Sequence, residues 1–407
     1  MANIAEGIRK AIYYKKELAF GELPTATGAK TLRRVTGNFN LSKETYQSEE
    51  IRTDYQMADF RHGVRSVEGS LNGELSPKSY SDFFAAALGR NFTAGVSVTG
   101  ITIDISESGA NYVITRSTGS FLTDGIKVGD VVRLTGSNLD SANVNKNLLV
   151  IAVTALDLTV IVMNKSLLVE QIDVLLSNVT VFGAKTFAPL TGHTSDSFTF
   201  EEWYNDITQS EVFTGNKVNT IGISLPATGL TTVDFGFMGQ DLKQSGTTQY
   251  FTSPTPQGND GIFAAVNGAL LVGGSVVGLV TGLTINVNRN LSMEPVVGSN
   301  FHPEIFDGRI LVDGEFTAFF TGGSFRDLFN NETETSLVVA LTTSNLKDAD
   351  FMSITLPRIK VNSDTKDDGE KGIVSTHSFQ ALLNFNGGAG TASEATTISI
   401  QDSAVTV

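Results

Sequence analysis

The sequence predicts a mainly β protein built from two similar segments, the first of which carries an additional small all-β domain. Three observations support this fold class. The chain combines 40 Gly and 26 Phe with only 18% charged residues, a composition that suits short strands joined by turns. Residues 64–75 alternate between apolar and polar side chains, as expected for a strand with one buried face. Residues 63–84 align without a gap with residues 308–329, which indicates an internal duplication.

The repeated stretch predicts a strand, a turn and a short helix in each copy. At the constant offset of 245 residues, Val67 aligns with Val312, and Leu71 aligns with Phe316. In the first copy we expect the helix over 79–89, with Ser79 or Ser81 as its N-cap and Gly89 at its end. A second match follows in the same order, Ile-Ser-Leu-Pro at 223–226 and Ile-Thr-Leu-Pro at 354–357.

The first copy is longer than the second by an excess of about 95 residues with its own strand pattern. Apolar runs rich in Val and Ile recur between residues 96 and 190, and they predict an inserted small β-barrel or sandwich. The predicted domains are therefore residues 1–95 with 191–245, an inserted β domain at 96–190, a linker at 246–260, and a second domain at 261–407.

Composition excludes several classes of protein. The net charge of −14 argues against a protein that binds nucleic acid tightly. The absence of Cys excludes disulfides, thiolate zinc sites and Cys nucleophiles. We expect no signal peptide at the N-terminus and no membrane insertion. The uncharged stretch 261–287 is long enough to span a bilayer, but its glycines and Asn267–Gly268 predict a hairpin between residues 263–266 and 269–272 instead.

Motifs for catalysis, metals and cofactors are not found, so we predict no enzyme, no metal site and no cofactor. The four His residues lack zinc-binding spacing. Residues 364–370 resemble the start of a calcium loop, but Lys366 and Ser375 stand where carboxylates are needed. A solvated hairpin tip is the better interpretation. These results favour a structural or interaction protein.

The N-terminal quarter carries a recognisable pattern. It reads Tyr-Tyr-Lys-Lys-Glu at 13–17, Phe-Gly-Glu-Leu-Pro at 20–24, Leu-Arg-Arg-Val-Thr at 32–36, and Val-Glu-Gly-Ser-Leu-Asn-Gly-Glu-Leu at 67–75. This pattern resembles the tail tube proteins of long-tailed bacteriophages, most densely over residues 1–90 and more weakly through 198–240 and 280–385.

The resemblance implies two β-sandwich or barrel domains, each with a short helix, and a structural role in the phage tail. Such subunits form stacked rings whose inner sheets line a channel for DNA during genome delivery. With two tube domains per chain, we expect a homotrimeric ring with pseudo-six-fold symmetry. The resemblance also implies other tail proteins as partners, such as the tape measure and the tail terminator, and a location in the virion after synthesis in the host cytoplasm. A decoration or adhesion β protein of the virion is the alternative.

Two sets of residues are candidates for function in such a tube. A channel that lets DNA slide should repel phosphate weakly and evenly, so we assign the polar faces of the repeated strands to the lumen, with Glu68, Glu74, Asp313 and Glu315 as its acidic lining. The alternative is that these side chains face outer solvent or an interface. The charged loop 42–62, whose counterpart is 287–307, is a candidate contact between rings or a plain mobile hairpin, and its candidate residues are Lys43, Glu49, Glu50, Arg52 and Asp54.

Overall fold

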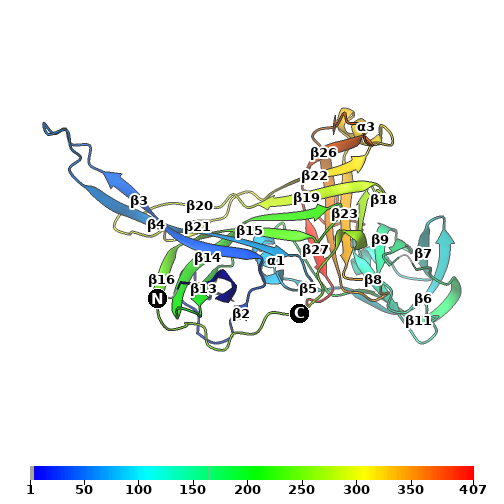
Figure 1. The fold of residues 1–407 in the computed structure, drawn as a ribbon. Helices are drawn as coiled ribbons and strands as arrows, with labels where there is room; N and C mark the ends of the chain where they lie inside the picture. Colours follow the sequence, from blue (N-terminus) through cyan, green and yellow to red (C-terminus); the bar gives the residue numbers. More distant parts are fainter. Residues whose placement is uncertain (1–3, 165) are drawn as a thin grey trace.

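The computed structural model describes residues 4–164 and 166–407 and confirms the mainly β class (Figure 1). Its strands form two stacked layers in each of the two segments, with a closed barrel attached to the second. One layer runs through both segments without a break, and we call it the long sheet. Behind it, each segment has its own back sheet.

The first segment contributes four strands to the long sheet: β3 (Thr36–Gln47), β4 (Phe60–Glu74), β15 (Thr232–Gly239) and the second half of β14 (Gln209–Pro226). Its back sheet contains β2 (Lys30–Thr31), β1 (Lys10–Lys16), β13 (Phe198–Tyr204), the first half of β14 and β16 (Asp241–Gly246). A short 3-10 turn, η1 (Gly7–Arg9), precedes β1.

The second segment repeats this arrangement. It adds to the long sheet β19 (Val280–Asn288), β22 (Leu311–Phe319), β26 (Val374–Ala381), β25 (Thr365–Lys366) and the end of β24 (Phe351–Val361). Its back sheet contains β18 (Ser275–Val276), β17 (Gly268–Val272), β23 (Thr335–Thr342), the start of β24, β27 (Ser399–Asp402), β12 (Ala184–Phe187) and β5 (Thr93–Ala94). A two-stranded sheet of β20 (Ser292–Met293) and β21 (Ile305–Phe306) lies against the first segment, where Lys217 Nζ of β14 donates to the backbone oxygen of Ile305 at 2.7 Å.

The two segments share one strand order and one register. Val67 in β4 lies opposite Gly239 in β15, and its aligned residue Val312 in β22 lies opposite Ala381 in β26. In both segments one long strand, β14 or β24, bends from the back sheet into the long sheet. The aligned stretches 63–84 and 308–329 therefore have the same topology.

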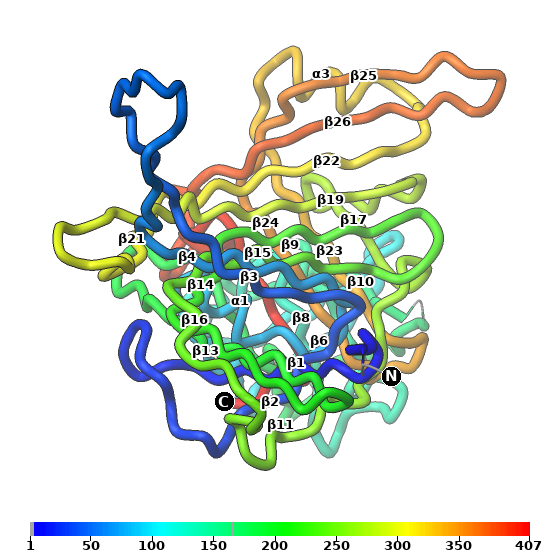
Figure 2. Tube along the Cα trace, turned by 60° about the vertical axis from the view of Figure 1, so that its left-hand side comes forward, coloured from blue at the N-terminus to red at the C-terminus, as the bar shows by residue number. Residues whose placement is uncertain are grey.

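The segments are joined edge to edge by β14 and β19. These strands pair antiparallel over seven residues, from Thr220 opposite Asn288 to Pro226 opposite Gly282. The order across the long sheet is therefore β3, β4, β15, β14, β19, β22, β26 and β24 with β25 (Figure 2). Buried side chains from both segments form one continuous hydrophobic core beneath it.

The predicted helix is present as α1 (Ser81–Leu88), and α3 (Ser324–Asn330) follows the aligned strand in the second segment. Gly89 ends α1 in the left-handed conformation, as predicted, at φ 69°. The predicted serine caps are wrong, because Tyr80 precedes the helix without a side-chain cap. The hydroxyl of Ser79 instead accepts a hydrogen bond from Ser76 at 2.7 Å.

Two other sequence predictions fail. Asn267–Gly268 is not a hairpin turn, because η2 (Ala265–Asn267) leads directly into β17, and the chain reverses at Gly273–Gly274 before β18. Both of those glycines have positive φ, which the turn requires. The two Leu-Pro motifs are not equivalent, because 223–226 pairs with β15 and β19 in the long sheet, whereas 354–357 lies in the back sheet.

The extra residues of the first segment form a closed barrel. Its strands are β6 (Ser97–Ser108), β7 (Asn111–Arg116), β8 (Val131–Thr135), β9 (Leu148–Val153), β10 (Asp157–Val162) and β11 (Gln171–Val181), and Phe121 of α2 (Phe121–Asp124) packs into its core. The barrel ends before residue 190, because β12 leaves it to join the back sheet. Val131 and Leu149 pack against Val338 and Phe351 on the outer side of that sheet.

The stretch predicted as a linker is fixed to the first segment. Phe251 is fully buried, and its backbone N–H donates to Glu201 Oε2 at 2.8 Å. The N–H of Tyr250 donates to the other carboxylate oxygen of Glu201 at 2.6 Å. The buried carboxylate of Glu201 thus binds the backbone of residues 250 and 251. The stretch 246–260 between the segments is therefore packed against the first segment, and we call it the strap.

The aligned helices give a matched test of packing. We expect Phe84→Ala to lower the free energy of unfolding by about 3–5 kcal/mol, because a buried aromatic ring is lost, and Phe84 is 1% exposed. Phe329, at the same position of the repeat, is 40% exposed, so Phe329→Ala should cost less than about 1 kcal/mol. Urea unfolding of the two variants measures the difference, and equal losses would contradict the packing described for α1.

Candidate assembly interface and channel face

The outward face of the long sheet is a polar surface that spans both segments. One row of directly opposed residues crosses six strands and reads Asn72, Asp234, Gly222, Asn286, Asp313 and Gln380. The next row reads Glu74, Thr232, Ser224, Thr284, Glu315 and Ser378. Directly opposed residues in a sheet share one face, so we call these rows and their neighbours the polar face.

The structure brings all four predicted carboxylates onto this face. Glu68, Asp313 and Glu315 are exposed, and Glu74 is half-buried. Sequence reasoning missed a fifth carboxylate, Asp234, which accepts a hydrogen bond from the Asn72 amide at 2.6 Å. The alternation of Val233, Asp234 and Phe235 in β15 was the signal that could have found it.

The apolar side chains of the same strands point to the other side and form the core. Phe83 of α1 lies between the two layers, with its ring centroid 4.9 Å from Tyr14 in the back sheet and 5.4 Å from Phe235 in the long sheet. In the second segment, Leu337 and Val339 of β23 face this core, while Val338 faces the barrel. The order of layers there is polar face, long sheet, core, back sheet and barrel.

In the predicted loop 42–62, residues 42–47 and 60–62 pair as strands and form the base, and the other twelve residues form the tip; we call the whole stretch the arm. Lys43 lies within β3, opposite Arg65, and only residues 48–59 connect the strands. Glu49, Glu50, Arg52 and Asp54 all lie at this exposed tip, where Arg52 and Asp54 form an ion pair of 2.6 Å. Figures 1 and 2 show the arm reaching away from the body of the molecule.

The arm also carries apolar side chains, which the sequence analysis did not single out. Ile51 and Tyr55 are almost completely exposed, and Met57 is 60% exposed. The counterpart region 287–307 contains β20 and β21 and lies against the base of the arm, where Arg65 N donates to Asn300 O at 2.9 Å. Exposed apolar groups of this kind are typical of surfaces that meet another protein.

The long sheet ends in two exposed edges. At one end β3 pairs with β4 alone, and at the other β25 pairs with β26 alone. Residues 36–38 of β3 and 365–372 beyond β24 are mostly exposed. An unpaired strand edge presents backbone N–H and C=O groups that another strand can bind. The chain therefore has two surfaces suited to edge-to-edge association.

A buried histidine lies close to the second edge. His377 occupies the core side of β26, with its Nδ1 3.4 Å from Asp364 Oδ1 and its Nε2 2.9 Å from Ser375 Oγ. Burial lowers the pKa of His377, although Asp364 acts in the opposite direction. The predicted hairpin tip 364–370 is displaced along the chain: the Asp364 side chain is buried beside His377, and residues 367–373 connect β25 with β26.

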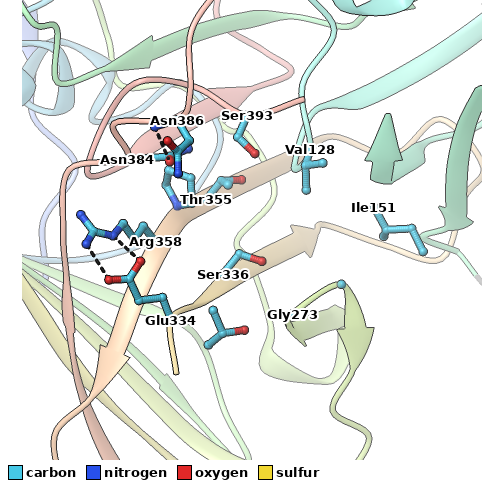
Figure 3. A pocket seen from close by; sticks show the side chains of 13 residues that line it. Val128, Ile151, Gly273, Glu334, Ser336, Thr355, Arg358, Asn384, Asn386 and Ser393 are labelled. Carbon is cyan, nitrogen blue, oxygen red and sulfur yellow. Dashed lines mark hydrogen bonds and ion pairs between the residues drawn. The ribbon is translucent and has the colours of Figure 1, made fainter. Parts of the chain in front are cut away.

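A pocket of about 420 Å³ lies between one side of the barrel and the back sheet (Figure 3). Val128 and Ile151 line it from the barrel. Its charged residues, Glu334 and Arg358, form an ion pair. Arg358 Nη2 donates to Glu334 Oε1 at 2.5 Å, and Arg358 Nε donates to Glu334 Oε2 at 2.7 Å. The hydrogen bond from Arg358 lowers the pKa of Glu334. Because these charges are paired with each other, the pocket offers no free acid or base.

Within the described residues, no group of three or more His, Asp or Glu side chains is placed to hold a metal ion. No helix in the same part of the chain is long and apolar enough to cross a membrane. The features that distinguish this molecule are its polar face, its two free edges and its arm.

A comparison with known protein families found a match that covers most of the chain. Residues 7–399 match the family described as phage tail tube protein. A search of curated proteins found no match.

The position of His377 predicts a pH dependence of stability. The pKa of His377 is lowered in the folded chain, so the unfolded chain, with a His pKa of about 6.5, takes up the proton first as the pH falls. The stabilising contribution of neutral His377 is therefore lost below about pH 6.5. We expect His377→Phe, which introduces the residue found at the aligned Phe235, to weaken the fall in unfolding free energy between pH 7 and pH 5. An unchanged pH profile in urea unfolding would contradict this.

Proposed function

The chain belongs to the phage tail tube protein family, and from this we propose that three copies close into one ring and that stacked rings conduct DNA. Membership of the family makes the chain a structural subunit of the virion tail that assembles with itself and other tail proteins. The ring, its symmetry and the passage of DNA are our proposal. The observation that carries it is the β14–β19 pairing between two segments of like topology.

The pairing inside the chain supplies a template for pairing between chains. By their places in the sheet, β19 corresponds to β3, and β14 corresponds to β24 with β25. The internal contact of β14 with β19 thus has an external equivalent, β24–β25 of one copy with β3 of the next. These two strands are the free edges of the long sheet. An interface of this heterologous kind closes into a ring when its rotation allows.

The same template gives the register of the contact. Thr220 lies opposite Asn288 in the internal pairing. Their counterparts are Ser363, which contacts Ser378 at 2.7 Å, and Ser42, which lies opposite Ser66 in β4. Residues 363–369 of one copy would then pair with residues 36–42 of the next. Because each copy holds two equivalent segments, three copies supply the six required for pseudo-six-fold symmetry.

The polar face is proposed as the wall of the channel. It is the outward surface of the only layer that runs through both segments of the described chain, and it carries Glu68, Glu74, Asp313 and Glu315. The barrel packs on the opposite side of the second segment. A ring closed through the long sheet with this face inward therefore places the barrel on the outside of the tube.

The arm is proposed as a contact between stacked rings. It extends past the region where β4 pairs with β15, and its exposed tip holds Glu49, Glu50, Arg52 and Asp54.

The tape measure and tail terminator are proposed partners of the finished tube. A decoration or adhesion protein remains the second candidate, favoured by the exposed barrel surface around Ile172, which is 81% exposed.

A disulfide across the proposed ring contact tests symmetry and register together. The chain has no Cys, and directly opposed residues in a sheet are close enough for a disulfide. We expect the double variant Ser42→Cys/Ser363→Cys to give covalent trimers and no larger species after oxidation of assembled protein, measured by non-reducing electrophoresis and native mass spectrometry. The single-Cys variants should give no trimers. A covalent hexamer would refute the three-copy ring.

Charge reversal tests the channel wall. Tubes of the variant Glu68→Lys/Glu74→Lys/Asp313→Lys/Glu315→Lys should retain double-stranded DNA at low salt and release it at high salt, because each lysine that contacts phosphate adds about 0.9 to the salt slope. Wild-type tubes should pass DNA freely. A variant with four lysines on the barrel surface is the matched control. Equal DNA retention by both variants would place the four carboxylates outside the channel.

A further inference from the structure

Two backbone groups at the outer edge of β3 are already bound by charged side chains of the same chain. Lys10 Nζ donates to the backbone oxygen of Gly37 at 3.0 Å, and the backbone N–H of Phe39 donates to Glu202 Oε1 at 2.9 Å. Lys10 and Glu202 form an ion pair of 2.7 Å between them. The side chains are 11% and 2% exposed, so this is a largely buried pair.

The backbone groups bound by this pair are those a neighbouring strand requires. The C=O of residue 37 and the N–H of residue 39 flank residue 38 on one side of the strand, where a partner strand would exchange its bonds. An N–H that already donates to a carboxylate is not available to that partner. The pair therefore occupies two backbone groups at the edge of β3 in the isolated chain.

The equivalent place in the second segment contains no charge. Glu202 lies opposite Ile12 in β1, and the corresponding pair in the second segment is Val339 opposite Leu270 in β17. Lys10, two residues before Ile12, corresponds to Gly268, two residues before Leu270. There, the counterparts of Gly37 and Phe39 are Leu283 and Ile285, which pair with β14. The ion pair is thus present at the free edge and replaced by Gly and Val at the joined edge.

We propose that the Lys10–Glu202 pair is a latch that closes the β3 edge in the free chain and yields it to the β24–β25 strand of another copy when a ring forms. This inference rests on the ring contact of the proposed function and adds a control step to it. On ring closure, the two backbone bonds are exchanged for strand bonds, while Lys10 and Glu202 keep each other and Glu202 keeps the Tyr204 hydroxyl, which donates at 2.7 Å. The exchange conserves hydrogen bonds, so the latch slows assembly more than it weakens the finished ring.

The test replaces the pair by apolar residues. In Lys10→Met/Glu202→Val the buried charges are removed together, a change that is often neutral or stabilising for the fold. We expect the lag before tube formation, followed by light scattering, to shorten at least about tenfold, because two hydrogen bonds no longer hold the edge. The matched control is Lys16→Met/Asp196→Val, which removes an ion pair of 2.6 Å next to the same strands and should keep the wild-type lag.

A second, conservative variant keeps the test decisive if the double variant does not fold. Glu202→Gln keeps an oxygen that can accept from Phe39 N–H, so its lag should lie between those of the wild type and the double variant. Circular dichroism and thermal unfolding establish whether each variant is folded. If the wild type assembles and both folded variants keep its lag, the latch is refuted and the ring contact stands. If the disulfide of Ser42→Cys/Ser363→Cys fails to form in assembled tubes that keep Lys10 and Glu202, the ring contact itself is refuted.

Discussion

The antiparallel pairing of β14 with β19 is the contact on which the rest of the structure depends. It joins the strands of the two segments into one layer, aligns the polar rows across both segments, and leaves β3 and β25 as the unpaired ends. Backbone hydrogen bonds fix this register, and a shift by one residue would turn every side chain to the opposite face. The polar face and the core are therefore both consequences of one strand pairing.

The two segments share a topology, but the side chains buried at equivalent positions differ in chemistry. The first buries charged and polar groups: Glu17 accepts hydrogen bonds from Ser197, Thr199, Gly21 and Gly215, and Glu201 holds the strap through Phe251. Burial raises the pKa of Glu17. The second segment has Val339 where Glu202 stands, and the barrel covers its back sheet. A buried carboxylate needs fixed hydrogen-bond partners. Glu202 finds one at the edge of β3 and Glu201 finds one in the strap, so both parts of the first segment are held by buried carboxylates.

Some sequence predictions failed because local patterns were decided by distant contacts. Asn267–Gly268 has the composition of a hairpin turn, yet Gly268 begins a strand that pairs with β23, and the reversal occurs at Gly273–Gly274. The two Leu-Pro motifs match in letters but occupy different layers. The arm is polar enough to predict a loop, but backbone pairing between β3 and β4 continues through its base as far as Gln47 opposite Phe60.

The β class, the helix ended by Gly89, the gapless repeat and the polar side of its strands could all be predicted from local sequence, because alternation and turn chemistry are properties of neighbouring residues. Tertiary structure alone decided that the repeats share one sheet, that Asp234 joins Glu68 on its face, and that Lys10 meets Glu202 at the edge of β3. These depend on residues up to about 190 positions apart, such as Lys10 and Glu202, and no local pattern encodes which distant strands will meet.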